Sequence, residues 1–137
     1  MKEIVIPATK ENLEQVTAFV EGELEAIECP IKTTMQILVA VEEIYINIAS
    51  YAYSPEVGTA TITFDVHDTE EGKEAEIGFY DQGIPFNPLE KEDPDVNKKA
   101  EDRSIGGLGI FMVKNTMDEF TYEYKDGKNT VKIVKNF

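Results

Sequence analysis

Residues 39–53 of the chain read VAVEEIYINIASYAY. The apolar positions recur at helical spacing, so this stretch predicts the second half of a helix over residues 32–53. Glu43 and Asn47 interrupt the apolar pattern four residues apart, which places both on one face of that helix. Glu42 points about 100° away from Glu43 and is expected to face solvent. From this stretch alone, Glu43 and Asn47 are either part of a site or an ordinary solvent-facing polar pair.

The composition is that of a globular domain. The chain has 137 residues, of which 42% are apolar and 29% are charged, and we expect residues 1–137 to form a single domain. The formal net charge of −14 repels phosphate backbones and anionic lipids, so neither a nucleic-acid nor a membrane partner is expected. A nucleotide remains compatible, because local backbone donors and a magnesium ion can outweigh the global charge.

The sequence indicates a cytoplasmic location. No apolar run reaches the length of a membrane span, and the first residues, MKEIVIP, lack the pattern of a signal peptide. The single cysteine, Cys29, cannot form an internal disulfide, which fits a reducing compartment.

The order of the predicted elements indicates an α+β fold. Hydrophobic periodicity predicts strands at 3–6, from Gly58 to about 66, at 75–81, 119–125 and 129–136, and helices at 10–28, 32–53 and 110–117. Residues 67–73 are expected to form a polar hairpin connection, and residues 81–105 a long loop. We therefore expect a two-layer sandwich, in which helices cover one face of a mixed, mostly antiparallel sheet.

An acidic residue ends the strand expected at 75–81. The chain there reads Asp81-Gln82-Gly83-Ile84-Pro85. Such an acid can accept a hydrogen bond from the amino group of a base, and the glycine lets a ligand approach the backbone. An ordinary turn after a strand is the alternative interpretation.

A glycine-rich segment, Gly106-Gly107-Leu108-Gly109, precedes the helix expected at 110–117. Free amides at a helix N-terminus, with no side chains in the way, form a cradle for phosphates. A lone glycine cluster also suits a plain flexible loop, so its meaning depends on the other two clusters.

Together, the three clusters resemble the Bergerat ATP-binding fold of the GHKL superfamily, which includes DNA gyrases, Hsp90 chaperones, histidine kinases and MutL proteins. The resemblance covers residues 31–137, and the chain length matches one subgroup, the small anti-sigma-factor serine/threonine kinases. Residues 47–53 look like the N-box of that subgroup, residues 81–88 like its adenine loop and residues 102–104 like the end of its ATP lid. Pro85 stands where the superfamily has a second glycine, and it removes one amide donor.

The resemblance implies a role for each matching residue. Glu43 would be the general base that takes the proton from an attacking hydroxyl, and Asn47 would bind Mg²⁺ through its amide oxygen. Asp81 would accept a hydrogen bond from the adenine amino group, with Gly83 lining the base. The remaining implied ATP contacts are Arg103 at the γ-phosphate, Gly106, Gly107, Leu108 and Gly109 at the phosphates, and Thr130 near adenine through water.

The implied reaction is transfer of the ATP γ-phosphoryl group to a STAS-domain anti-anti-sigma protein. The resemblance also implies a sigma factor as a further partner and a homodimer as the assembly. Two alternatives stay open: an ATP-sensing binding module without kinase activity, and a detached histidine-kinase ATP domain acting in trans. The second alternative fits less well, because the only histidine, His67, lies in the expected hairpin.

Overall fold

The computed structural model describes residues 1–52, 58–88 and 107–137, and of Tyr51, Gly107 and Leu108 the backbone alone. The elements confirm the α+β class expected from the sequence. In chain order they are strand β1 (Lys2–Pro7), a 3₁₀ turn (Lys10–Asn12), helix α1 (Leu13–Ala26), helix α2 (Ile31–Asn47), a π-helical turn (Ile48–Ala52), strands β2 (Thr59–Thr69) and β3 (Gly72–Asp81), helix α3 (Gly107–Thr116), and strands β4 (Glu119–Lys125) and β5 (Lys128–Asn136).

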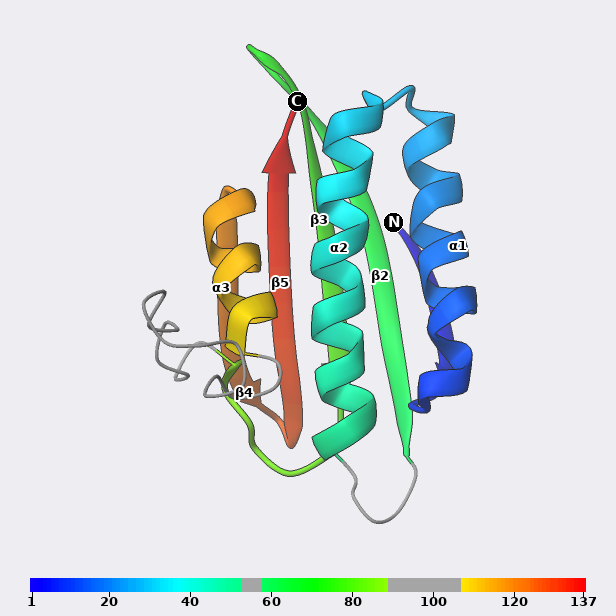
Figure 1. Ribbon diagram of the computed structural model, residues 1–137, viewed down its shortest axis with the longest axis vertical. Coiled ribbons are helices and arrows are strands. Elements are labelled where there is room, and N and C mark those ends of the chain that lie inside the picture. Colours follow the sequence, from blue (N-terminus) through cyan, green and yellow to red (C-terminus); the bar gives the residue numbers. More distant parts are fainter. Residues whose placement is uncertain (53–57, 89–106) are drawn as a thin grey trace.

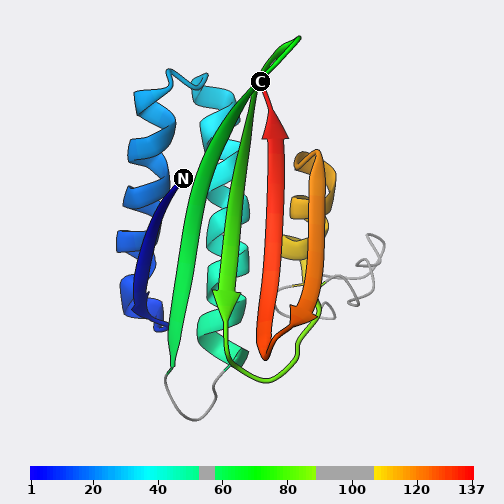
Figure 2. The same ribbon diagram turned by 180° about the vertical axis from the view of Figure 1, so that it is seen from behind.

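The five described strands form one sheet in the order β1-β2-β3-β5-β4. Every neighbouring pair of described strands is antiparallel. The sequence had predicted a mixed, mostly antiparallel sheet, and the described strands include no parallel pair. Tight hairpins join β2 to β3 and β4 to β5 and produce two of these antiparallel pairs, while β1–β2 and β3–β5 pair in the same sense through longer connections. All three helices lie on one face of the sheet, and the other face is open (Figures 1 and 2).

Strand alternation determines which side chains meet the helices. On β2 and β3 the buried residues include Ile62, Phe64, Ile77 and Phe79, each two positions from the next on its strand. The predicted connection at 67–73 was too long, because the ladder continues to the pair Thr69↔Gly72. Pairs of polar residues extend the β2–β3 hairpin beyond the core. The alternation of apolar and polar residues ends where the core ends, so it did not predict this extension.

The helices pack by the apolar stripes that the sequence predicts. Helix α1 buries Val16, Val20 and Leu24, and α2 buries a longer stripe that includes Tyr45. The Tyr45 hydroxyl donates to the Thr9 carbonyl oxygen at 2.7 Å, which fastens α2 to the segment that follows β1. Thr9 makes no side-chain cap, and the α-helix proper begins at Leu13, three residues later than predicted.

The helix expected over 32–53 changes form near its end. The α-helical hydrogen bonding ends at Asn47, and residues 48–52 form a π-helical turn. Such turns are rare and are frequently found at functional sites. No described helix is long and apolar enough to cross a membrane.

Candidate functional site

A small pocket opens between the last turns of α2 and the adjoining ends of β3 and β5. Apolar side chains form most of its wall, and three polar residues, Asn47, Asp81 and Asn129, interrupt it. The complete lining is Ile44, Asn47, Ile48, Ala52, Asp81, Phe86, Pro88, Asn129 and Val131. An apolar pocket with a few convergent polar groups is the usual form of a small-molecule site.

Asp81 is the last residue of β3 and faces the helices. It is 5% exposed, and its Oδ1 accepts hydrogen bonds from the Gly83 amide and from Asn129 Nδ2, both at 2.9 Å. Within the described residues, no hydrogen bond reaches Oδ2. Burial raises the pKa of the Asp81 carboxyl, while the hydrogen bonds from Asn129 and Gly83 oppose that rise. The carboxyl therefore presents one unsatisfied acceptor oxygen to a largely apolar pocket.

Asn47 is held at the junction between α2 and the π-helical turn. Its Nδ2 donates to the Glu43 carbonyl oxygen at 2.8 Å, which fixes the orientation of the amide. The residue is 7% exposed and lines the same pocket as Asp81. In the part of the chain that the structure describes, its Oδ1 accepts no hydrogen bond, so this oxygen is available to a ligand.

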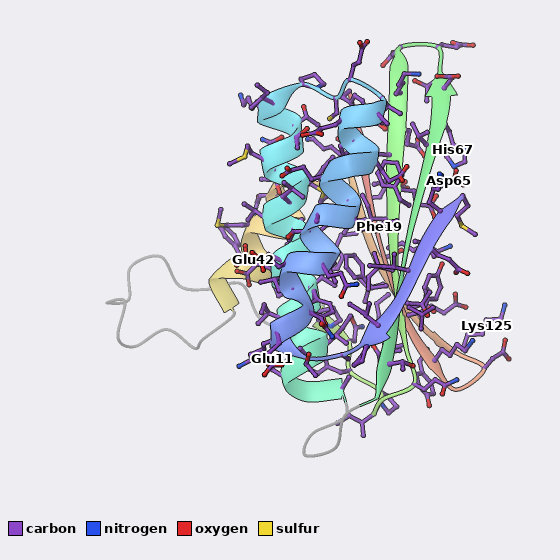
Figure 3. All side chains as sticks on the ribbon, turned by 90° about the vertical axis from the view of Figure 1, so that its right-hand side faces the viewer. Glu11, Phe19, Glu42, Asp65, His67 and Lys125 are labelled. Atoms are coloured by element: carbon purple, nitrogen blue, oxygen red, sulfur yellow. The ribbon has the colours of Figure 1, made fainter. Side chains whose placement is uncertain are left out.

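Glu43 lies one helical turn before Asn47 and meets helix α3. A Cβ atom built on Gly109 would lie 1.9 Å from Glu43 Oε2, so the carboxylate occupies the space beside that glycine. Glu42 is exposed and lies on the side of α2 away from the sheet (Figure 3). The structure thus distinguishes the two adjacent acids as the spacing predicts.

Gly83 contacts the end of the second helix. A Cβ atom at this position would lie 2.2 Å from the Ala52 carbonyl oxygen, and the next amide, Ile84 N, donates to that oxygen at 2.9 Å. Gly83 is therefore needed for close packing of two backbone segments. Its α-carbon is not part of the pocket wall, where the sequence had placed it beside a base.

Asn129 is the polar residue of β5 that reaches the pocket. It pairs directly with Asp81 across the strands and is 3% exposed. Its Nδ2 donates to Asp81 Oδ1 and, at 2.8 Å, to the Ile84 carbonyl oxygen. Its Oδ1 accepts from the Phe86 amide at 3.1 Å and from the Tyr122 hydroxyl. Asn129 therefore joins Asp81 to the loop that follows β3.

Thr130 is not among the residues that line this pocket, and its predicted water-mediated role near adenine stays a prediction. Neighbouring residues of a strand point to opposite faces, and Asn129 and Val131 both line the pocket. Thr130 is consequently directed to the open face of the sheet. Asn129 was not singled out from the sequence, although the buried alternation through Val131 and Ile133 could have identified it as facing the helices.

The predicted phosphate-binding residues are only partly described. Arg103 and Gly106 lie outside the described residues. Gly107, Leu108 and Gly109 form the first turn of α3, where backbone amides have no partner within the helix. This turn adjoins Glu43 through Gly109, so candidate phosphate donors and the candidate base are neighbours.

Comparison with known proteins agrees with this arrangement. The family model described as "Histidine kinase-like ATPase domain" matches residues 6–135. The chain belongs to this family. It is 27% identical over 129 residues to a serine-protein kinase RsbW of Bacillus mycoides (strain KBAB4), covering 91% of the chain and 78% of the relative. It is 28% identical, with the same coverage, to the RsbW of Bacillus cereus (strain B4264).

A solved structure supports the same fold for this histidine kinase-like ATPase domain. The crystal structure of the SiaB-SiaC complex from Pseudomonas aeruginosa matches with a TM-score of 0.56 at 14% identity, and covers 100% of this chain and 90% of that one. The family model and the RsbW relatives confirm the resemblance to the GHKL superfamily and its anti-sigma kinase subgroup.

The residues of the pocket fit a magnesium–nucleotide complex. Asn47 Oδ1 and Asp81 Oδ2 accept no hydrogen bond from the described residues; the first is suited to a cation and the second to an amino group. Among residues 1–52, 58–88 and 107–137, no three His, Cys, Asp or Glu side chains come together as a metal site.

Proposed function

We propose that this histidine kinase-like ATPase domain is an ATP-dependent serine/threonine protein kinase of the anti-sigma-factor type. The observation that carries the proposal is that Asn47 and Asp81 line one largely apolar pocket, while Glu43 lies beside the first turn of α3. The kinase relatives at 27–28% identity support this choice of reaction.

Adenine occupies the pocket in this proposal. Asp81 Oδ2 accepts a hydrogen bond from the adenine amino group, and the apolar wall that includes Ile44, Ile48 and Val131 packs on the ring. Asn129 positions Asp81 without contacting the nucleotide, because both ends of its amide are already hydrogen-bonded.

The phosphates extend from this pocket toward α3. The amides of Gly107, Leu108 and Gly109 hold them, with Gly106 and Arg103 as further proposed contacts. Asn47 Oδ1 would hold Mg²⁺, which would neutralise phosphate charge when bound. These assignments use two kinds of group among the described residues: the backbone N–H groups of the first turn of α3 and the side-chain amide oxygen of Asn47.

Glu43 acts as the general base. Its carboxylate accepts the proton of an acceptor serine or threonine hydroxyl as the hydroxyl oxygen bonds to the γ-phosphorus. The bond between the γ-phosphorus and the β–γ bridging oxygen breaks, and ADP leaves with the bonding electrons. Phosphoryl transfer depends mainly on positioning and charge neutralisation, which this arrangement supplies.

The proposed acceptor is a STAS-domain anti-anti-sigma protein. The kinase relatives and the solved complex of SiaB with SiaC support a protein partner. A sigma factor as a second partner and a homodimer as the assembly belong to the same proposal.

The test is phosphoryl transfer from γ-labelled ATP to a purified STAS-domain protein from the same genome. We expect wild type to label a serine or threonine of that protein, and Glu43→Gln to bind ATP normally but to label at least about a hundredfold more slowly. Glu42→Gln is the matched control and should retain the wild-type rate at saturating acceptor, because Glu42 is exposed.

Each other outcome identifies a different function. ATP binding without transfer by wild type to any STAS-domain protein would favour an ATP-sensing binding module. Label on a histidine of another protein would favour a histidine-kinase domain acting in trans. Equal transfer rates for wild type and Glu43→Gln would contradict the role of Glu43 as base.

A further inference from the structure

We propose that the groove between α2 and α3 is the docking surface for the phospho-acceptor protein. This inference rests on the proposed kinase function and adds a location for the acceptor. The groove is lined by Met35, Gln36, Val39, Met112 and Thr116.

The groove belongs to an exposed apolar stripe, which we call the α2–α3 stripe and define as Ile31, Met35, Val39 and Met112. These side chains are 82%, 60%, 40% and 44% exposed, respectively. The three on α2 follow one another at intervals of four residues and so share one face of the helix. The stripe holds four of the eight exposed large apolar residues of the described chain. Such clustering marks an interaction surface, whereas scattered exposed apolar residues are ordinary.

The position of the stripe suggests which partner uses it. Val39 lies four residues before Glu43 on α2, and Met112 lies three residues after Gly109 on α3. Glu43 and Gly109 touch each other, so both walls of the groove lead to the candidate base within about one helical turn. A protein seated in the groove is therefore placed beside the group that must accept its hydroxyl proton.

Size and charge favour an acceptor protein over a second copy of this chain. A second copy seated here would bring two acidic chains, each of formal charge −14, together at a small contact, so the proposed homodimer is expected to form at another face. Four side chains also offer far less area than the ~1,600 Å² of a standard stable interface. A small apolar contact suits a substrate that must leave after each turnover. The acceptor should present apolar side chains on a ridge with lysine or arginine beside it, which complements the acidic domain.

The methionines of the groove suit a surface that binds and releases its partner. Met35 and Met112 face each other's helices across the groove, and flexible thioether side chains adapt to different surfaces. The same property makes the stripe directly observable, because the chain contains four methionines, Met1, Met35, Met112 and Met117. Met117 is 7% exposed, and Met1 is 84% exposed at the chain start, so each serves as an internal control.

The first test is methyl NMR of the protein labelled with ¹³C at the methionine methyl groups, titrated with the STAS-domain protein. We expect saturable shifts of the Met35 and Met112 methyl signals, and unchanged Met1 and Met117 signals. Unchanged Met35 and Met112 signals would overturn the proposal. Concentration-dependent shifts of those signals in the protein alone would overturn it in favour of a second copy.

The second test is steady-state transfer with Met35→Gln and Met112→Gln. Each should raise KM for the acceptor by about tenfold and leave kcat and the Kd for ATP within about twofold of wild type. Val5→Gln is the control, because Val5 is 60% exposed on β1, far from the groove in sequence and on another element. An unchanged KM, or an equal rise for Val5→Gln, would overturn the docking site.

The two tests separate failure of docking from failure of the proposed function. If no STAS-domain protein is phosphorylated but the Met35 and Met112 signals still shift, docking stands and the kinase function fails. If transfer occurs and those signals stay fixed, the kinase function stands and docking elsewhere replaces this proposal.

Discussion

The carboxylate of Glu43 on α2 fills the space where a side chain at Gly109 on α3 would lie. A Cβ at Gly109 would be 1.9 Å from Oε2 and 2.2 Å from Cδ of Glu43. The glycine therefore permits the first turn of α3 to approach an acid, and the positive end of the helix dipole favours that acid. This relationship places the candidate base and the candidate phosphate-binding turn in contact.

Replacing Gly109 should test that contact. Gly109→Ala forces the Glu43 carboxylate to move and is expected to lower the free energy of unfolding by about 1–3 kcal/mol. The matched control is Gly22→Ala in α1, where an added Cβ meets nothing within 4 Å. Gly22→Ala should raise the free energy of unfolding by roughly 0.5–1 kcal/mol, measured by urea denaturation.

A double-mutant cycle identifies the cause of the Gly109 effect. Removing the Glu43 side chain as well, in Glu43→Ala/Gly109→Ala, should recover most of the stability lost in the single Gly109 variant. If the two effects simply add, the collision with Glu43 is not what destabilises Gly109→Ala.

Asn47 should govern the magnesium dependence of ATP binding. Asn47→Ala removes the proposed metal ligand and is expected to weaken Mg²⁺-dependent ATP binding by on the order of tenfold or more, measured by calorimetry. Asn115→Ala is a close control, since Asn115 Nδ2 donates to the Phe111 carbonyl at 2.7 Å in the same way as Asn47 donates to Glu43. Comparable loss of affinity in both variants would mean that a helical side-chain hydrogen bond, and no metal, explains the result.

Replacing Asn129 should weaken ATP binding, whereas replacing its neighbour Thr130 should not. Asn129→Ala leaves Asp81 and two loop groups without their partner, so we expect a loss of about 1–3 kcal/mol in the free energy of unfolding and weaker ATP binding. Thr130→Ala, on the other face of β5, should leave the Kd for ATP unchanged. The reverse ranking of the two variants in an ATP titration would restore Thr130 to the site.

Asp81 should give stability a distinct pH dependence. Because burial raises its pKa above the ordinary 3.8, the folded protein retains this proton to a higher pH than the unfolded chain does. Its contribution to the free energy of unfolding is therefore fully present below about pH 3.8 and is lost as pH rises through the raised pKa. Asp81→Asn cannot titrate, so the stability of wild type relative to this variant should fall as pH rises from about 4. Urea denaturation at several pH values measures it, and a relative stability that grows with pH would contradict the raised pKa.

Much of the fold follows from patterns of short range. Alternation in β2 and β3 predicted their buried faces, and the four-residue spacing predicted that Glu43 and Asn47 share a face while Glu42 does not. These patterns were informative because burial on one face imposes a fixed period on each element. The extra length of the β2–β3 hairpin escaped them, since its ends lie beyond the core.

The rest of the site depends on contacts between distant segments. The need for Gly83 arises from the Ala52 carbonyl oxygen, and the importance of Asn129 arises from Asp81, 48 residues earlier. The π-helical turn after Asn47 left no signal in the apolar spacing. Spacing within one element cannot predict such contacts, because each is determined by how two elements pack.

The central claim is that the pocket between α2, β3 and β5 binds ATP through Asp81. Calorimetric titration of wild type and Asp81→Asn with ATP, each with and without Mg²⁺, tests it most directly. The account predicts one saturable, Mg²⁺-enhanced site in wild type and at least about tenfold weaker binding in the variant. The side-chain amide of Asp81→Asn would either turn its NH₂ donor toward the adenine amino group or accept that hydrogen bond through a neutral oxygen, without the charge of a carboxylate. No saturable binding by wild type, or equal affinity in the two proteins, would contradict it.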